Sequence, residues 1–144
     1  MSAEILLCVV VAITDGDTLT VRCAQETIKT RLSEIDAPEK SQPWGQRSKE
    51  ALSSMCFGKS AELRPLNTDR YGRTVARVVC DGVDVNLAQV RAGMAWAYRK
   101  YLRDPIILAA EDTARVERRG LWADSTPLPP WEWRAWVRTH KISQ

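Results

Sequence analysis

The sequence predicts an α+β protein that is mainly β, and the order of its segments carries this prediction. Five segments run apolar or alternate in character over strand lengths, and turn signals separate them. A helical segment follows the third strand, and two more helices follow the fifth. The 144 residues suit one domain. We therefore expect a small closed barrel of five strands, of the OB type, with three packed helices.

The chain opens with a predicted β-hairpin. Residues 5–14 form a near-continuous apolar run, and Asp15-Gly16 is a signal for a type I′ turn into a second strand that ends at Cys23. This two-residue loop gives the following facing pairs: Ala12 with Leu19, Val10 with Val21, and Cys8 with Cys23. Facing cysteines lie within disulfide range, so we predict a Cys8–Cys23 bridge.

Turn and cap signals bound the remaining elements. The predicted strands are 27–35, 60–66 and 74–80, and the predicted helices are 46–56, a short one from Asp84 to Gly93, and one from Asp104-Pro105 to Gly120. The last helix has an aspartate suited to cap its start and a proline at its first position. Its predicted inner face is Ile106, Ala109, Ala110, Thr113 and Val116.

The composition changes near residue 124. We expect one OB-fold domain over 1–123 and a Pro/Trp-rich tail over 124–144 that packs on the same domain. Its tryptophans would fold back, because several exposed indoles favour aggregation; stacking on nucleic-acid bases is the alternative. No stretch is long enough to cross a membrane.

The cysteines indicate disulfides more than metal binding. The four cysteines form no CxxC pair and His140 is the single histidine, so a zinc site is poorly supported. We favour a second bridge, Cys56–Cys80, with buried free thiols as the alternative. Two bridges indicate a secreted or periplasmic protein whose signal peptide is absent from this sequence; a cytoplasmic protein with free thiols is the alternative.

Charged residues gather in three places along the chain, which are residues 15–17, 31–39 and 69–73. Asp17 follows the first hairpin turn, Asp36 precedes Ala37-Pro38, and each aspartate could be a simple turn former. Arg31 lies inside a strand, and Glu39 adds a carboxylate near the same opening. Carboxylates that can hold a hard cation, with arginines that can bind phosphate, are typical of a metal-assisted phosphodiesterase.

These segments resemble the staphylococcal (micrococcal) nuclease, or thermonuclease, family. The matching motifs, in the family's order, are Asp15-Gly16-Asp17-Thr18, Arg31 with Asp36-Ala37-Pro38-Glu39, Asp69-Arg70-Tyr71-Gly72-Arg73, the weaker segments Val85-Asn86 and 90–95, and Gly120-Leu121-Trp122. The resemblance implies an OB-fold barrel, dependence on Ca²⁺, and hydrolysis of DNA and RNA to products that end in 3′-phosphate.

The resemblance also implies a role for individual residues. Asp17 and Asp36 match the calcium-binding carboxylates. Ala37 stands where a threonine of the best-known member contributes its backbone carbonyl, which any residue can supply. Glu39 matches the proposed general base. The remaining matches are the arginines at the scissile phosphate, Arg31 and Arg73, and the groups at neighbouring phosphates, Arg70, Tyr71 and Tyr98.

Two other functions fit parts of the sequence. A non-catalytic nucleic-acid-binding module could use the same barrel, although it would not need the whole set of acids and arginines. A protein-interaction domain could instead use its Trp-rich tail. For the nuclease we expect DNA and RNA substrates read with little base preference, no membrane partner, and a monomer.

Overall fold

The computed structural model describes residues 4–140, and its barrel is built from five strands. These strands are β1 (Leu6–Asp15), β2 (Thr18–Cys23), β3 (Glu26–Leu32), β5 (Ser60–Thr68) and β6 (Thr74–Cys80). The short strands are β4 (Ile35–Asp36), β7 (Val83–Asp84) and β8 (Trp96–Ala97). The helices are α1 (Gly45–Cys56), α2 (Val85–Arg91), α3 (Pro105–Val116), the 3₁₀ turn η1 (Gly120–Ala123) and α4 (Pro130–His140).

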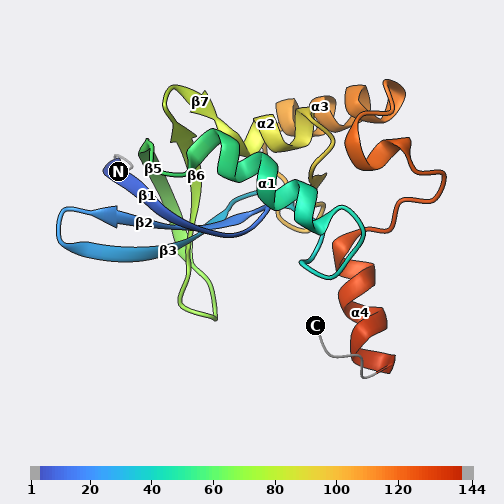
Figure 1. Ribbon diagram of the computed structural model, residues 1–144, viewed down its shortest axis with the longest axis horizontal. Coiled ribbons are helices and arrows are strands. Elements are labelled where there is room, and N and C mark those ends of the chain that lie inside the picture. Colours follow the sequence, from blue (N-terminus) through green and yellow to red (C-terminus); the bar gives the residue numbers. More distant parts are fainter. Residues whose placement is uncertain (1–3, 141–144) are drawn as a thin grey trace.

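The barrel closes because β3 pairs with two strands. Antiparallel neighbours run in the order β3-β2-β1-β5-β6, and β3 then pairs in parallel with β6, where Arg31 lies opposite Val75. Alternate residues point inward, so Val10, Leu19 and Leu63 are buried. The predicted mainly β, five-stranded barrel is confirmed, and Figure 1 shows the helices grouped at one side of it.

The register of the first hairpin is confirmed at one end and wrong at the other. Val10 pairs with Val21 as predicted, but Ala12 pairs with Thr20 and not with Leu19. Two irregularities between Val10 and Asp15 shift the register, and Asp15 pairs with Thr18. The turn residues are therefore Gly16 and Asp17, and Gly16 does not have the positive φ that a type I′ turn requires.

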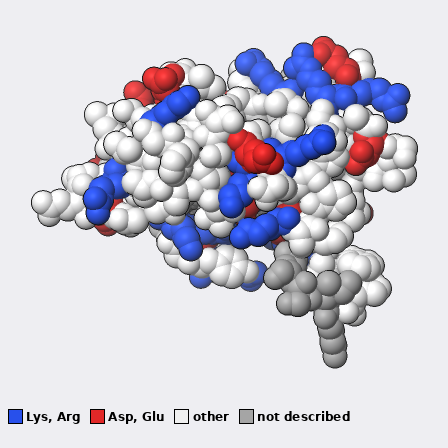
Figure 2. Space-filling view, in the orientation of Figure 1, with Lys and Arg blue, Asp and Glu red and all other residues white. Residues whose placement is uncertain are grey.

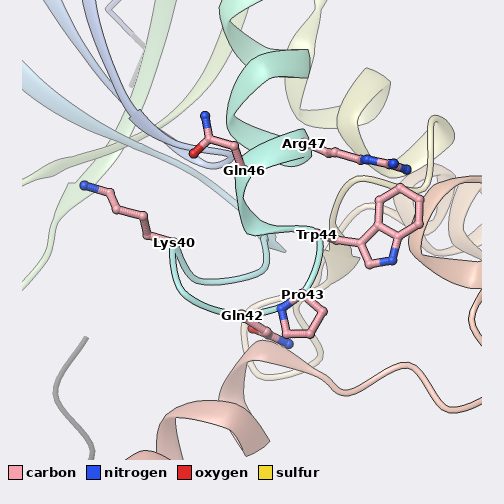
Figure 3. A pocket seen from close by; sticks show the side chains of 6 residues that line it. All are labelled: Lys40, Gln42, Pro43, Trp44, Gln46 and Arg47. Atoms are coloured by element: carbon pink, nitrogen blue, oxygen red, sulfur yellow. The ribbon is translucent and has the colours of Figure 1, made fainter.

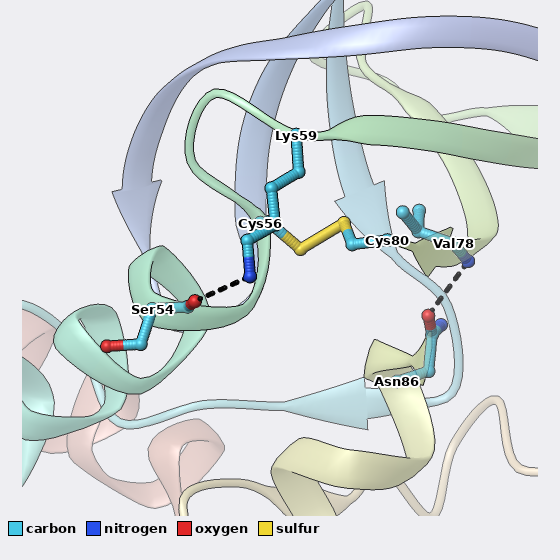
Figure 4. Close-up of a disulfide and its surroundings, with 6 residues drawn as sticks. All are labelled: Ser54, Cys56, Lys59, Val78, Cys80 and Asn86. Carbon is cyan, nitrogen blue, oxygen red and sulfur yellow. Dashed lines mark hydrogen bonds between the residues drawn. A yellow bond between two sulfur atoms is a disulfide. The ribbon is translucent and has the colours of Figure 1, made fainter. Parts of the chain in front are cut away.

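Both predicted disulfide pairs are present in the structure. Cys8–Cys23 joins β1 to β2, with Cα atoms 4.2 Å apart. Cys56–Cys80 joins the end of α1 to the end of β6, with Cα atoms 5.3 Å apart, and is shown in Figure 4. The second bridge fixes the C-terminal end of α1 to the barrel. The loop that follows Glu39 leads into the N-terminal end of α1.

The predicted N-terminal caps of α2 and α3 are confirmed, but α3 ends at Val116, before the predicted Gly120, and its predicted inner face is wrong. Asp84 accepts a hydrogen bond from the amide of Leu87, and Asp104 accepts one from the amide of Ile106. Ile106 and Val116 are exposed, whereas the buried residues of α3 are Ile107, Glu111 and Ala114. The buried face of α3 includes a charged residue, which the apolar pattern does not predict. Glu111 can be buried there because it accepts hydrogen bonds from the Ala97 amide and from two arginines.

The tail forms a fourth helix, α4, which the sequence interpretation did not include. Figure 1 shows it projecting from the body on the side opposite the turn between β2 and β3. The predicted domain ranges begin and end with residues 1–3 and 141–144, which lie outside the described residues. Within residues 4–140, no helix combines the length and the apolar character needed to cross a membrane.

Candidate active site

Two strand ends and a backbone kink bring the first candidate residues together. Thr18 pairs with Arg31 across β2 and β3, so Asp17 lies at the end of the strand beside Arg31. The predicted strand 27–35 is interrupted, because Glu34 has a φ of 67° and separates β3 from β4. Asp36 then lies on β4, which pairs with β8. The kink turns Asp36 toward Arg31.

Arg31 is the centre of the candidate site. Its Nη1 lies 3.3 Å from Asp17 Oδ2, and its Nη2 lies 3.2 Å from Asp36 Oδ1. Nη1 also donates to the backbone carbonyls of Leu32 and Ile35, both at 2.9 Å. These four contacts hold the guanidinium in one orientation, and the side chain is only 12% exposed.

Three aspartates crowd around this single arginine. Burial, followed by the charge of neighbouring Asp17, raises the pKa of Asp15 to about 8. Burial also raises the pKa of Asp36 to about 6, although hydrogen bonds from Arg134 oppose the change. Burial opposes ionisation of Asp17 too, but the charge of Arg31 and several hydrogen bonds together outweigh it, so the Asp17 pKa is lowered. Burial is thus the main reason for the two raised pKa values, and the negative charge of Asp17 adds to it.

A second guanidinium, which belongs to Arg134 in the tail, contacts the acids of the site. Arg134 on α4 donates from Nη2 to Asp36 Oδ2 at 2.7 Å and from Nη1 to Asp36 Oδ1 at 3.1 Å. Its Nη1 also reaches Glu39 Oε1 at 2.9 Å. Arg134 therefore links Asp36 to Glu39, two residues to which the sequence interpretation gave different roles. The sequence contained no local signal for this contact, because Arg134 lies 98 residues from Asp36.

Arg73 immediately precedes β6, the strand that pairs with β3, but belongs to a separate cluster. Val75, two residues after Arg73, pairs with Arg31. Its Nε donates to Asp69 Oδ2 at 2.8 Å, and its guanidinium lies 5.4 Å from the centre of the Tyr71 ring. Arg70 stacks on the same ring at 4.9 Å. No described contact joins this cluster to Asp17, Asp36 or Glu39 within residues 4–140.

Tyr98 and Ala37 both lie against the central cluster. The Arg31 guanidinium is 6.0 Å from the Tyr98 ring centre, and the Tyr98 ring stacks on Trp131 of α4 with centroids 5.6 Å apart. The amide of Ala37 donates to Asp17 Oδ2 at 2.8 Å, so the Ala37 backbone lies beside the Asp17 carboxylate.

The acids at this site are of the kind that a hard cation binds. The carboxylates of Asp17 and Asp36, with a backbone carbonyl such as that of Ala37, are ligand types that would suit Ca²⁺ with water in its other positions. Arg134 already contacts Asp36 in this cluster as a second positive group. Among residues 4–140, no three His, Cys, Asp or Glu side chains converge as a ligand group, so the carbonyl and water would have to complete the coordination.

A basic hollow lies next to Glu39. Its lining residues are Lys40, Gln42, Pro43, Trp44, Gln46 and Arg47, which Figure 3 shows around the loop before α1. The Arg47 guanidinium stacks on the Trp44 ring at 4.7 Å. Figure 2 shows that basic and acidic side chains are interspersed over this face, so positive charge is local and does not cover it.

The family profile described as "Staphylococcal nuclease homologue" matches residues 29–124, from the second half of β3 to the residue after η1. A protein from Haemophilus influenzae named "Uncharacterized endonuclease" is 48% identical over 143 residues, covering 99% of this chain and 79% of that protein. The chain belongs to the staphylococcal nuclease family.

Two more relatives of this nuclease agree with that assignment. An "Uncharacterized endonuclease" from Escherichia coli O157:H7 is 43% identical over 126 residues, covering 87% of this chain and 82% of that protein. A "Micrococcal nuclease" from Shigella flexneri is 38% identical over 136 residues, covering 87% and 78%. The resemblance predicted from the motifs is confirmed, and the protein is a phosphodiester hydrolase that acts on nucleic acid.

Asp15 and Arg134 are the two residues of this site that the sequence interpretation did not assign. Asp15 was interpreted as a turn former, and its Oδ1 accepts the amide of Asp17, two residues on, at 3.1 Å as a turn former would; the structure also places it in the acidic cluster, where burial raises its pKa. The doublet of acids around Gly16 could have indicated this cluster. For Arg134, the tail was interpreted through its tryptophans, and the arginine between them was passed over.

Proposed function

We propose that this nuclease is a calcium-dependent endonuclease that hydrolyses DNA and RNA, with little preference for sugar or base, to products ending in 3′-phosphate. The observation that carries the proposal is the convergence of Asp17 and Asp36 on Arg31, with Glu39 joined to the same cluster through Arg134. Acids without such a partner would support binding of a metal alone. The buried arginine adds a group that can bind phosphate.

The proposed roles follow from the chemistry of each side chain. Asp17, Asp36 and the Ala37 carbonyl would hold the calcium ion, which supplies positive charge to a phosphate oxygen and to the attacking water. Glu39 accepts a proton from that water. Arg31 and Arg73 donate to the phosphoryl oxygens as their negative charge grows, and their forked donors suit two oxygens at once.

Substrate binding involves the outer cluster and the tyrosine of the central one. Arg70 and Tyr71 are exposed at the loop before β6 and would contact a neighbouring phosphate. Tyr98 would contact another. These groups bind the backbone and not the base edges, so we propose weak sequence preference and an affinity that falls steeply with salt.

The remaining proposals concern the whole protein. Two disulfides suit an oxidising compartment, so we propose that the protein is secreted or periplasmic. We propose that it acts as a monomer, with residues 1–123 as the nuclease domain and residues 124–144 as a tail that packs on it.

The deciding experiment measures cleavage of plasmid DNA and of RNA with Ca²⁺, and again with a chelator. We expect cleavage of both only with Ca²⁺, with 3′-phosphate ends identified by mass spectrometry. Glu39→Ala should fold and lose at least ~100-fold in rate, while the exposed Glu62→Gln on β5 should match the wild type. Binding of DNA without cleavage under all conditions would support a non-catalytic module instead.

A further inference from the structure

The tail helix places a cation on the acids that the proposed function gives to calcium and water. Both oxygens of Asp36 accept from Arg134, at 3.1 and 2.7 Å, and Oδ1 also faces Arg31 at 3.2 Å. Arg134 lies 2.9 Å from Glu39 Oε1 as well. A Ca²⁺ ligand must approach the ion to 2.3–2.6 Å, and a guanidinium at hydrogen-bond distance occupies that space with like charge.

The same helix covers the proposed substrate-binding tyrosine. The Trp131 and Tyr98 rings stack with their planes 5° apart, and Arg134 Nη2 lies 3.5 Å from the Tyr98 hydroxyl. One helix thus contacts a proposed metal ligand, the proposed base and a proposed phosphate-contacting group. Packing of a helix against the barrel for stability alone does not require contacts with all three of these groups.

Beyond these contacts, α4 is attached through Trp131, whose ring packs edge-on against Trp96 with centroids 5.5 Å apart. The buried residues of α4 are Pro130 and Val137. The neighbouring linker is held separately, since Gln42 Nε2 donates to the Leu128 carbonyl at 2.6 Å and Trp44 Nε1 donates to Asp124 at 2.9 Å. Figure 1 shows α4 extending from the body beyond this linker. Opening of α4 with the linker still bound would separate Trp131 from Trp96 and Tyr98 and expose Val137.

We propose that α4 is an autoinhibitory lid, in which Arg134 occupies the place of the metal ion when the lid is closed. The inference rests on the proposed calcium site. Closure and Ca²⁺ binding then exclude each other, because both require Asp36. Linkage relates the two effects: the factor by which closure of the lid weakens Ca²⁺ binding equals the factor by which bound Ca²⁺ shifts the equilibrium of the lid toward the open state.

The first test is calorimetric titration of the full chain with Ca²⁺. Arg134→Gln keeps a polar side chain and removes the competing charge, so its dissociation constant for Ca²⁺ should be about 5- to 150-fold lower than that of the wild type. Arg138→Gln, an exposed arginine on the same helix, is the matched control and should stay within about 2-fold of the wild type, as a distant surface charge is screened.

The second test is hydrogen exchange of the α4 amides in the same proteins. In the wild type, these amides should exchange slowly with chelator and faster with saturating Ca²⁺, while the amides of α1 stay unchanged. In Arg134→Gln they should exchange fast in both conditions. Tighter Ca²⁺ binding without any change in α4 exchange would contradict the lid, since it would reflect the charge alone.

The two proposals fail in different ways. Equal Ca²⁺ affinity in the wild type and in Arg134→Gln would overturn the lid and leave the calcium site in place. Absence of Ca²⁺ binding in both proteins would overturn the calcium site and the lid together. Tighter binding with a faster-exchanging α4 supports both.

Discussion

Gly16 and Ser48 lie so close together that a β-carbon built on Gly16 would be 1.8 Å from the Ser48 hydroxyl oxygen. Gln89 Nε2 joins the same point, donating to the Gly16 carbonyl at 2.7 Å and to the Ser48 carbonyl at 3.1 Å. The hairpin turn, α1 and α2 therefore meet beside Asp17. The glycine is required by this close approach and not by the left-handed turn that the Asp-Gly pair predicts.

Gly16→Ala is expected to lower the free energy of unfolding by about 1–3 kcal/mol, because the new methyl group must push α1 or the turn away. Urea unfolding measures this change. Nuclease activity should fall as well, because the turn carries Asp17.

A double-variant cycle with Ser48→Ala gives the control. Ser48→Ala removes the closest atom, although it also removes the hydrogen bond to the Met94 carbonyl. The double variant should therefore lose less stability than the sum of the two single variants. Additive losses would mean that Gly16 and Ser48 do not compete for space.

Asp15→Asn is expected to stabilise the metal-free protein increasingly as pH rises. Burial raises the pKa of Asp15 from its ordinary value of 3.8 to about 8 in the folded protein, so the folded state holds this proton more tightly. Its contribution to the free energy of unfolding therefore falls as pH rises from about 4 to about 8. Asparagine has no charge to bury, and its oxygen can still accept the Asp17 amide.

Thermal unfolding in chelator between pH 4 and pH 9 measures this effect. The difference in Tm between Asp15→Asn and the wild type should grow in favour of the variant up to about pH 8 and then level off. Asp112→Asn, an exposed change of the same kind on α3, controls for net charge. A constant difference across the range would contradict the raised pKa.

The elements of the barrel could be predicted because local patterns decide them. Apolar strands, the capping aspartates Asp84 and Asp104, and the facing pair Cys8 and Cys23 each follow from neighbouring residues. The turn geometry could not, because Gly16 meets Ser48 of α1, and a contact between segments so far apart in the sequence leaves no local pattern.

The candidate site shows the same limit. The motifs indicated Asp17, Arg31 and Asp36, which lie close together because β2, β3 and β4 are consecutive in the chain. Arg134 reaches Asp36 from the other end of the chain through tertiary packing, which no periodicity records. The buried Glu111 was missed for a related reason, since its partners Ala97 and Arg99 lie on another element.

Glu111→Gln is expected to lower the free energy of unfolding by about 1.5–3 kcal/mol, since Oε1 loses its charged hydrogen bond to Arg99. Oε2 accepts the Ala97 amide at 2.7 Å, and Ala97 pairs with Ile35 next to Asp36. The variant should therefore also weaken Ca²⁺ binding. Chemical unfolding and Ca²⁺ titration measure the two effects. Glu117→Gln, whose carboxylate pairs with Arg119 at the surface, is the control and should change stability by less than about 1 kcal/mol.

Arg73→Lys is expected to keep the fold and to lower the rate of DNA cleavage at least ~100-fold, because lysine lacks the fork that binds two phosphoryl oxygens. Stability should change by less than about 1 kcal/mol, since the Arg73–Asp69 pair is partly exposed. Arg70→Lys is the matched control three residues away: Arg70 is exposed, and lysine keeps the positive charge that a neighbouring phosphate would meet, so its rate should remain near that of the wild type. Single-turnover cleavage with Ca²⁺ compares the two. Equal rates for Arg73→Lys and Arg70→Lys would remove Arg73 from the chemistry and leave Arg31 as the arginine at the scissile phosphate.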